Sequence, residues 1–216
     1  MNRYSSLRFV NNQGSTTTSK KKYRPGKHTY SEAVTGERKT AIFTTSMMRS
    51  IRIEELKERF MQGHVSIHRF PGGKAKHMKN QIATHLQEEL PDVAIIQCGG
   101  NDIPLNQRTS TTMLEIAKHI MDMVQECKDH GVEHVVVSNV LPREQAVYQL
   151  RRKELNDILR SICELQNVFF LDNDRHVDME RRIVLSKHID YDGVHFNAAG
   201  SEMFRDNIAE ILNSIC

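Results

Sequence analysis

The sequence is most informative at residues 93–102, which read VAIIQCGGND. The first four residues are apolar, which is typical of a strand that is buried on both faces of a parallel sheet. Gly99 and Gly100 follow, and two adjacent glycines permit an irregular loop. Asn101 and Asp102 then place polar side chains directly beyond the strand. We therefore expect a central strand whose carboxyl end leads into a polar loop.

Apolar runs and helical patterns alternate along the chain on both sides of this stretch. Short apolar or alternating runs indicate strands, and apolar residues that recur every three or four positions indicate helices. Strands that alternate with long helices form βαβ units, so the pattern predicts an α/β fold, a three-layer sandwich with a five-stranded parallel sheet and helices on both faces. The expected strands are residues 40–44, 64–70, 93–97, 135–137 and 168–171, and the expected helices are residues 51–62, 75–90, 111–130, 145–165 and 198–215.

The first part of the chain differs in composition from the rest. Residues 1–38 are rich in Ser, Thr, Asn and Lys and too polar to form a core, so we expect a disordered basic leader before a single domain at residues 39–216. No acidic residue precedes Glu32, whereas seven of the 30 basic residues do, which leaves 23 basic against 27 acidic residues in the remainder. This distribution confines any nucleic-acid contact to weak binding by the leader. A solvated leader without a ligand is the simpler interpretation.

The cysteines and the apolar segments bear on the compartment. Cys98, Cys127, Cys163 and Cys216 show neither CxxC nor metal-ligand spacing. The first ends an apolar strand and the next two lie in helical patterns, so we expect buried free thiols. The amino terminus has no apolar signal-peptide core, and nowhere do 18 apolar residues run together, so we expect no membrane span. These features predict a cytoplasmic location with reduced thiols.

Ser46 is the first candidate for chemistry. In open α/β sheets ligands bind beyond the carboxyl ends of the strands, and Ser46 follows the strand expected at residues 40–44. A serine at such a turn can expose its hydroxyl above the sheet. Taken alone, Ser46 is better explained as the N-cap of the next helix, a common use of serine. Arg49 lies close to Ser46 in the sequence, where it could either contact an acidic substrate or form a surface ion pair.

Two further strands end in candidate hydrogen-bond donors. Gly72 follows the strand at residues 64–70, and a glycine lets the backbone approach a ligand closely and present its N–H group. Asn101 follows the strand at residues 93–97, and its side-chain amide is a neutral donor suited to an oxyanion. Each also has an ordinary interpretation, a Pro-Gly-Gly turn for the first and an Asx turn for the second.

Asp192 and His195 form the last candidate group, just before the final helix. A carboxylate three residues before a histidine can accept a hydrogen bond from Nδ1–H and leave Nε2 free as a base. Of the 11 histidines, only His195 has an Asp at this spacing. One such pair arises by chance in many chains of this size, so the pair is weak evidence by itself.

Together these segments resemble the signature of the SGNH hydrolases, the GDSL-like esterases and lipases. That family carries a Ser, a Gly, an Asn within GxND and a DxxH pair, in this order. Here GGND is complete at Gly99–Asp102 and DGVH is complete at Asp192–His195, and the resemblance extends from about Thr40 to the carboxyl terminus. It implies the flavodoxin-like strand topology of that family. The GxSxG signature of the α/β-hydrolases is absent, which argues against that other serine-esterase fold.

The first block departs from the family pattern. The family has Gly-Asp-Ser there, and this chain has Thr44-Thr45-Ser46. The serine is retained, whereas the lost Asp normally organises the loops around the site and the lost Gly changes the turn. The departure therefore bears on turnover and not on the fold.

The resemblance implies a serine esterase with Ser46 as nucleophile, His195 as base and Asp192 as the residue that orients the base. The backbone N–H groups of Ser46 and Gly72 and the amide of Asn101 would then form the oxyanion hole. The implied substrate is a small ester, since the sequence contains no long apolar lid segment. This chemistry requires neither a metal nor an organic cofactor.

A narrower resemblance links the chain to the esterase-type domains of invertebrate non-LTR retrotransposon proteins. It depends on the basic leader and on the segments YSEAV at Tyr30–Val34, TSMMRSI at Thr45–Ile51 and FPGGKAKHM at Phe70–Met78. This relation and the altered first block support an alternative function, in which a catalytically weak or inactive esterase fold binds nucleic acid or serves assembly. Nucleotide binding on a flavodoxin-like sheet is a third interpretation, but neither GxGxxG nor GxxxxGK[ST] occurs.

Overall fold

The computed structural model describes residues 38–57, 63–105, 111–174 and 182–215. The predicted leader therefore lies almost entirely outside the described residues, as does Cys216. The domain boundary expected at residue 39 stays a prediction, although the first described strand begins at Lys39.

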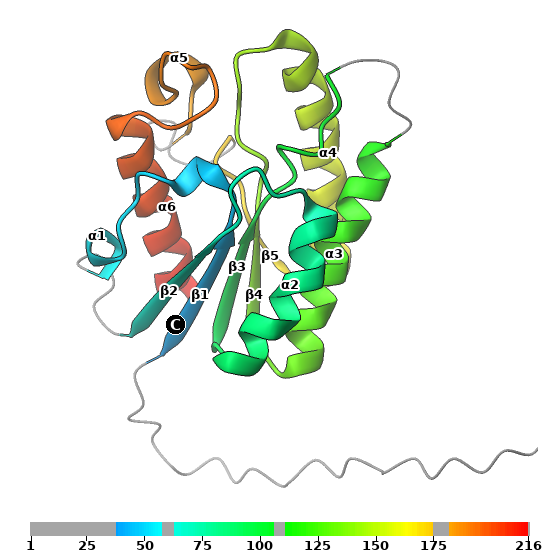
Figure 1. The fold of residues 1–216 in the computed structure, drawn as a ribbon, viewed down its shortest axis with the longest axis vertical. Coiled ribbons are helices and arrows are strands. Elements are labelled where there is room, and N and C mark those ends of the chain that lie inside the picture. The colour runs from blue at the N-terminus through cyan, green and yellow to red at the C-terminus, as the bar shows by residue number, and fades with distance from the viewer. Residues whose placement is uncertain (1–37, 58–62, 106–110, 175–181, 216) are drawn as a thin grey trace, which may run out of the picture. The chain divides into compact units, whose positions relative to one another are not determined.

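Five parallel strands form one sheet in the order β2-β1-β3-β4-β5. This architecture confirms the predicted α/β fold, and the strand order is that of flavodoxin-like sheets (Figure 1). Because β1 lies between β2 and β3, the loops that follow these three strands leave the sheet side by side. The strands are β1 at Lys39–Thr44, β2 at His64–Arg69, β3 at Val93–Gln97, β4 at His134–Ser138 and β5 at Phe169–Leu171.

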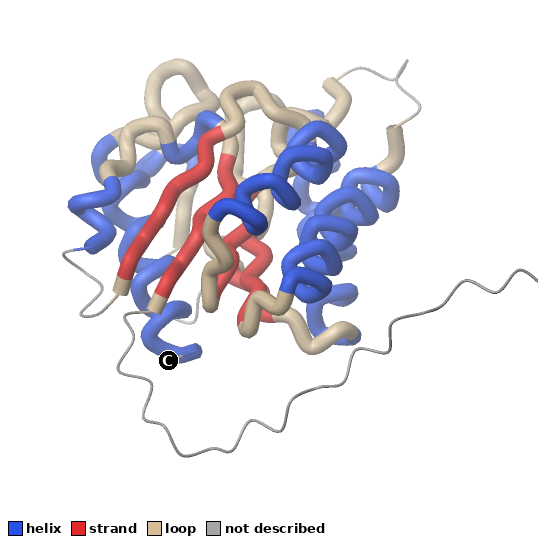
Figure 2. Tube along the Cα trace, turned by 60° about the horizontal axis from the view of Figure 1, so that its bottom comes forward, coloured by secondary structure: helices blue, strands red, loops and turns tan. Residues whose placement is uncertain are grey.

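Helices cover both faces of the sheet (Figures 1 and 2). One face carries α2 at Ala75–Glu88, α3 at Met113–His130 and α4 at Ala146–Leu165. The other carries the short helix α1 at Ile53–Lys57 and the closing helix α6 at Ala198–Ile215. A 3₁₀ turn, η1 at Ser46–Met48, and a short helix, α5 at Leu185–His188, complete the described elements.

Alternation along the strands separates two hydrophobic cores. In β1, the side chains of Ala41 and Phe43 pack beneath α2, α3 and α4, whereas Ile42 between them packs with α1 and α6. The same alternation holds in β3, where Ile96 and Ile95 point to opposite cores. Both faces of the central strands are therefore buried, as the continuous apolar run at residues 93–96 predicted.

Helix boundaries follow local signals. At α3, Thr112 and Glu115 form a capping box, and Gly131 ends the helix with φ of 94°. The helix expected to reach Leu90 ends at Glu88, because Pro91 disfavours helical backbone at the residue before it. Of the helix expected at residues 51–62, the structure describes Ile53–Lys57 as helix, and residues 58–62 lie outside the described part. The helix α5 was not expected, since its segment is too short for a periodic pattern.

Burial of the thiols agrees with the sequence. Cys98, Cys127 and Cys163 are buried and make no disulfide. Burial raises the pKa of Cys98 well above its ordinary value, and it raises the pKa of both Cys127 and Cys163 to about 12. Among the described helices, none combines the length and the apolar character that crossing a membrane requires.

Candidate active site

Strand register brings the candidate loops to one edge of the sheet. Thr44, the last residue of β1, pairs with Arg69 at the end of β2 and with Gln97 at the end of β3. The Thr44 hydroxyl also donates to Gln97 Oε1 at 2.8 Å, and both side chains are buried. The segments that carry Ser46, Gly72 and Asn101 therefore leave the sheet at the same level.

Ser46 opens the 3₁₀ turn η1 directly after β1. Its Oγ lies 3.2 Å from Nε2 of His195. Thr45 occupies the N-cap position of this turn, so Ser46 is not its N-cap. Met47 and Met48 are buried in the core beneath the turn, which fixes the direction in which Ser46 points.

His195 and Asp192 come together on the turn that precedes α6. Nδ1 of His195 lies 2.7 Å from Asp192 Oδ2, and Asp192 Oδ1 accepts the backbone N–H groups of Val194 and His195 at 2.9 Å each. These bonds to His195 and Val194 lower the pKa of Asp192. Gly193 permits the turn with φ of 67°. With Nδ1 protonated and bonded to an ionised carboxylate, Nε2 is the acceptor that faces Ser46.

Arg49 makes the surface ion pair that was one of its two expected roles. Its Nη2 lies 3.5 Å from Asp192 Oδ2, and its side chain is 56% exposed. A pair this long and this exposed contributes little to stability. Arg49 nevertheless places a positive charge next to the carboxylate that orients His195.

The two candidate oxyanion donors outside η1 belong to loops that bond to each other. Gly72 has φ of 67°, and nothing lies within 4 Å of the place where a Cβ would be. Nδ2 of Asn101 donates to the backbone oxygen of Gly73 at 3.1 Å. The Asn101 side chain thus joins the loop after β3 to the loop after β2, rather than closing an Asx turn on its own segment.

Asp102 has a structural task beside this pair. Its two carboxylate oxygens lie 3.1 and 2.9 Å from the backbone nitrogen of Ala75, so Asp102 caps the first turn of α2 from outside the helix. Burial raises the pKa of Asp102. The GGND segment therefore supplies both a candidate donor and a cap for the helix that follows Gly72.

The loop between β4 and α4, residues 139–145, also reaches the site, and sequence reasoning missed it. Nη2 of Arg143 donates to Asn101 Oδ1 at 2.8 Å, and the backbone N–H of Glu144 donates to the oxygen of Gly193 at 2.9 Å. The rule that ligands bind beyond the ends of parallel strands applies to β4 as well, and that rule was the available signal.

A hollow of about 410 Å³ lies beside the candidate donors. Its lining includes Gly72 but neither Ser46 nor His195, so it adjoins the polar group without containing the reactive pair. The remaining lining residues are Arg69, Phe70, Pro71, Gly73, His77, Met78 and Gln81.

Comparison with known families gives one match. The GDSL-like Lipase/Acylhydrolase family matches residues 54–203 of this chain. The matched range includes Gly72, Asn101, Asp192 and His195 and begins after Ser46, in keeping with the altered first block. No curated protein matches the chain. The narrower resemblance to retrotransposon proteins stays a prediction.

Solved structures share the fold at low sequence identity. A lipase/acylhydrolase from Enterococcus faecalis is similar with a TM-score of 0.68 and 19% identity, over 82% of this chain and 96% of that one. A GDSL-like lipase from Bacteroides thetaiotaomicron has a TM-score of 0.67 and 13% identity, over 83% and 89%. A mutant of an acetyl-xylooligosaccharide esterase from Geobacillus has a TM-score of 0.65 and 16% identity, over 81% and 93%. At these identities the similarity establishes the fold.

Proposed function

This chain belongs to the GDSL-like lipase/acylhydrolase family, and from that premise we propose that it is a serine esterase that cleaves small esters with Ser46 as its nucleophile. One observation carries the proposal. Ser46 Oγ, the His195 ring and the Asp192 carboxylate form a continuous chain of contacts, with 3.2 Å at the first step and 2.7 Å at the second. Nucleophile, base and orienting group are within hydrogen-bond reach in the order that acyl transfer requires.

Each residue has a defined part in the reaction. His195 Nε2 takes the proton from Ser46 Oγ, which attacks the ester carbonyl and forms a tetrahedral intermediate. The resulting oxyanion accepts hydrogen bonds from the backbone N–H groups of Ser46 and Gly72 and from Nδ2 of Asn101. His195 then gives the proton to the departing alcohol, and water, activated in the same way, releases the acid from Ser46. Asp192 keeps Nδ1 protonated throughout.

The altered first block is compatible with this reaction. The chain lacks the family's Asp at position 45, but other contacts hold the loops, namely Asn101 to Gly73 and Asp102 to Ala75. The alternative, an inactive module, does not account for the contact between Ser46 and His195. It also depends on a leader that lies outside the described residues. The contact therefore favours the enzyme.

Labelling with a fluorophosphonate probe tests the proposal without knowledge of the true substrate. We expect wild type to be labelled and to hydrolyse a short-chain p-nitrophenyl ester, and we expect both signals to vanish in Ser46→Ala. Ser50→Ala is the matched control, because Ser50 lies four residues away and bonds to Ser201. Labelling of Ser46→Ala as strong as that of wild type would contradict the proposal, as would an unlabelled wild type.

A further inference from the structure

The side-chain amide of Asn101 is held in a single orientation. An Asn amide can in principle exchange the places of its oxygen and nitrogen. Here Oδ1 accepts from Arg143 Nη2 at 2.8 Å, and Nδ2 donates to the oxygen of Gly73 at 3.1 Å. The exchanged orientation would set the NH₂ group against a guanidinium and Oδ1 against a carbonyl oxygen, so both contacts would become repulsive. Nδ2 keeps a second hydrogen that this arrangement does not use.

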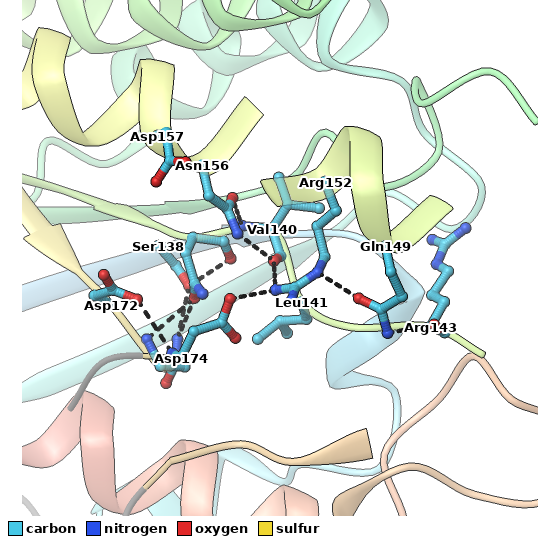
Figure 3. A network of polar contacts seen from close by, with 12 residues as sticks. Ser138, Val140, Leu141, Arg143, Gln149, Arg152, Asn156, Asp157, Asp172 and Asp174 are labelled. Carbon is cyan, nitrogen blue, oxygen red and sulfur yellow. Dashed lines mark hydrogen bonds and ion pairs between the residues drawn. The ribbon is translucent and has the colours of Figure 1, made fainter. Parts of the chain in front are cut away.

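The loop that carries Arg143 is anchored at its other end. Gln149 Nε2 donates to the backbone oxygen of Arg143 at 2.6 Å, and Gln149 Oε1 accepts from Arg152 Nε at 2.8 Å. Arg152 in turn bonds to the oxygen of Val140 at 3.1 Å and to Asp174 (Figure 3). The backbone of Arg143 is therefore fixed with respect to α4, and its side chain extends from a rigid base.

The guanidinium itself has little other support. It lies over the ring of Tyr148, with Cζ 5.0 Å from the ring centroid, and Tyr148 is buried with its hydroxyl bonded to Leu141. Nε of Arg143 is buried and has no hydrogen-bond partner among the described residues. The position of the guanidinium thus depends chiefly on Asn101 and on the Tyr148 ring.

Gly100 provides the space for this contact. A Cβ at Gly100 would lie 3.0 Å from Arg143 Nη2 and 2.8 Å from the Tyr148 hydroxyl. A larger residue there would displace the guanidinium from Asn101. The second glycine of GGND is thereby explained by the approach of Arg143.

The same loop contacts the turn of the candidate base. The backbone N–H of Glu144 donates to the oxygen of Gly193 at 2.9 Å, and a Cβ at Gly193 would lie 2.9 Å from the Cβ of Glu144. Neighbouring residues of one loop therefore bond to Asn101 on one side and to the Asp192–His195 turn on the other. Residues 139–145 tie together the two halves of the site.

We propose that Arg143 is a positioning residue, which holds Asn101 with Nδ2 toward the oxyanion and strengthens that donor. The inference rests on the proposed function, because it assigns the unused hydrogen of Nδ2 to the oxyanion. The charged guanidinium that donates to Oδ1 polarises the amide, and polarised hydrogen bonds in series reinforce one another. Arg143 contacts neither Ser46 nor the substrate carbonyl, and it acts through Asn101.

Steady-state kinetics on a short-chain p-nitrophenyl ester provide the first test. Loss of an oxyanion donor lowers kcat by about 10²–10³, and loss of its positioning should lower kcat by part of that, about 10- to 100-fold in Arg143→Met, with KM little changed. Arg143→Lys retains the charge and should recover part of kcat. Lys153→Met removes a positive charge from an exposed position of α4 and should leave kcat unchanged.

A double-mutant cycle separates positioning from general damage. In an Asn101→Ala background, Arg143→Met should lower kcat hardly further, because the group that it positions is gone. An equal loss of kcat in both backgrounds would overturn the proposal. So would a loss in Arg143→Met that appears in KM or in the melting temperature and leaves kcat unaffected.

The orientation of Asn101 can be measured without turnover. In full-length protein labelled with ¹⁵N-asparagine, the side-chain NH₂ signals of Asn101 are assigned by their absence in Asn101→Ala. We expect chemical shifts displaced from those of an exposed asparagine and slow hydrogen exchange in wild type, and shifts close to those of an exposed asparagine with faster hydrogen exchange in Arg143→Met. Unchanged signals would overturn the role of Arg143. A different result would separate the two proposals. If the NH₂ signals behave as expected but the fluorophosphonate probe does not label the protein, the proposed function is wrong, while Arg143 still orients Asn101.

Discussion

Three hydrogen bonds determine the charge of Asp192. The carboxylate accepts one hydrogen bond from Nδ1 of the His195 ring and two from the backbone N–H groups of His195 and Val194. All three favour the ionised form, so the pKa of Asp192 falls below the ordinary value of 3.8. Asp192 therefore stays charged across the neutral and mildly acidic range.

Asp192→Asn tests that charge. We expect kcat to fall by up to about 10⁴-fold, because an amide does not hold the histidine tautomer that leaves Nε2 as acceptor.

The difference in stability between wild type and Asp192→Asn should shrink as the pH falls. A lowered folded-state pKa stabilises the fold above pH 3.8, and that contribution disappears as the pH falls further. Melting temperatures of both proteins from pH 7 to pH 2.5 check this, and a difference that grows toward low pH would contradict it.

A short sequence spacing made the contact between Asp192 and His195 predictable, and the long-range contact of Arg143 escaped prediction. The pair is separated by three positions, so one turn can bring the two side chains together. Arg143 and Asn101 are separated by 42 positions, and their contact depends on how two loops leave neighbouring strands. No spacing rule reports such a contact. The contact between Ser46 and His195, which are 149 positions apart, likewise depends on the folded chain and follows from no spacing rule.

At the scale of elements, apolar periodicity located the long helices and missed the four-residue helix α5. The patterns at residues 75–90, 111–130 and 198–215 each correspond to a helix, because each carries several turns of buried apolar residues. The helix α1 lies within the range expected at residues 51–62, whereas α5 has four residues, too few for a periodic pattern to indicate it. The exact strand ends were also set by pairing with neighbours.

The packing of β2 against α2 should depend on pH through His68. His68 stacks on Phe43 of β1 with 5.0 Å between ring centroids, and its ring lies tilted by 39° against that of His85 of α2 with 4.3 Å between centroids. Burial, and secondarily the charge of His85, lowers the pKa of His68 below 6.5. Between pH 6.5 and that lowered pKa the unfolded chain binds more protons than the folded one. The free energy of unfolding should therefore fall as the pH drops below 6.5.

His68→Phe removes this titration and keeps the stacking. Urea unfolding of wild type and variant between pH 7.5 and pH 5 should show a shallower loss of stability in the variant. Equal slopes for wild type and His68→Phe would show that His68 is not responsible.

At the scale of the whole fold, parallel topology gathers the site from distant segments. Loops after β1, β2, β3 and β4 and the turn before α6 supply the candidate residues, and all lie at the carboxyl edge of the sheet. Because the strands were predictable from their apolar runs, the edge at which the candidate residues gather was predictable as well. The two cores that hold the sheet, one on each face, lie below this edge and contain none of the candidate polar side chains.

The thiols provide a measure of how cooperatively this fold opens. Cys98, Cys127 and Cys163 all belong to the core beneath α2, α3 and α4, and a thiol reagent reaches them only when that core opens. In a Cys216→Ser variant, which leaves these three, we expect no rapid reaction with a thiol reagent in native buffer and three readily labelled thiols in denaturant. If the core opens as one unit, the three should react at a common slow rate, and Leu159→Ala, which opens a cavity in that core, should raise all three rates together. Mass spectrometry of the labelled peptides follows each thiol, and rapid labelling of one of them in native buffer would mean that its segment opens independently of the rest of the core.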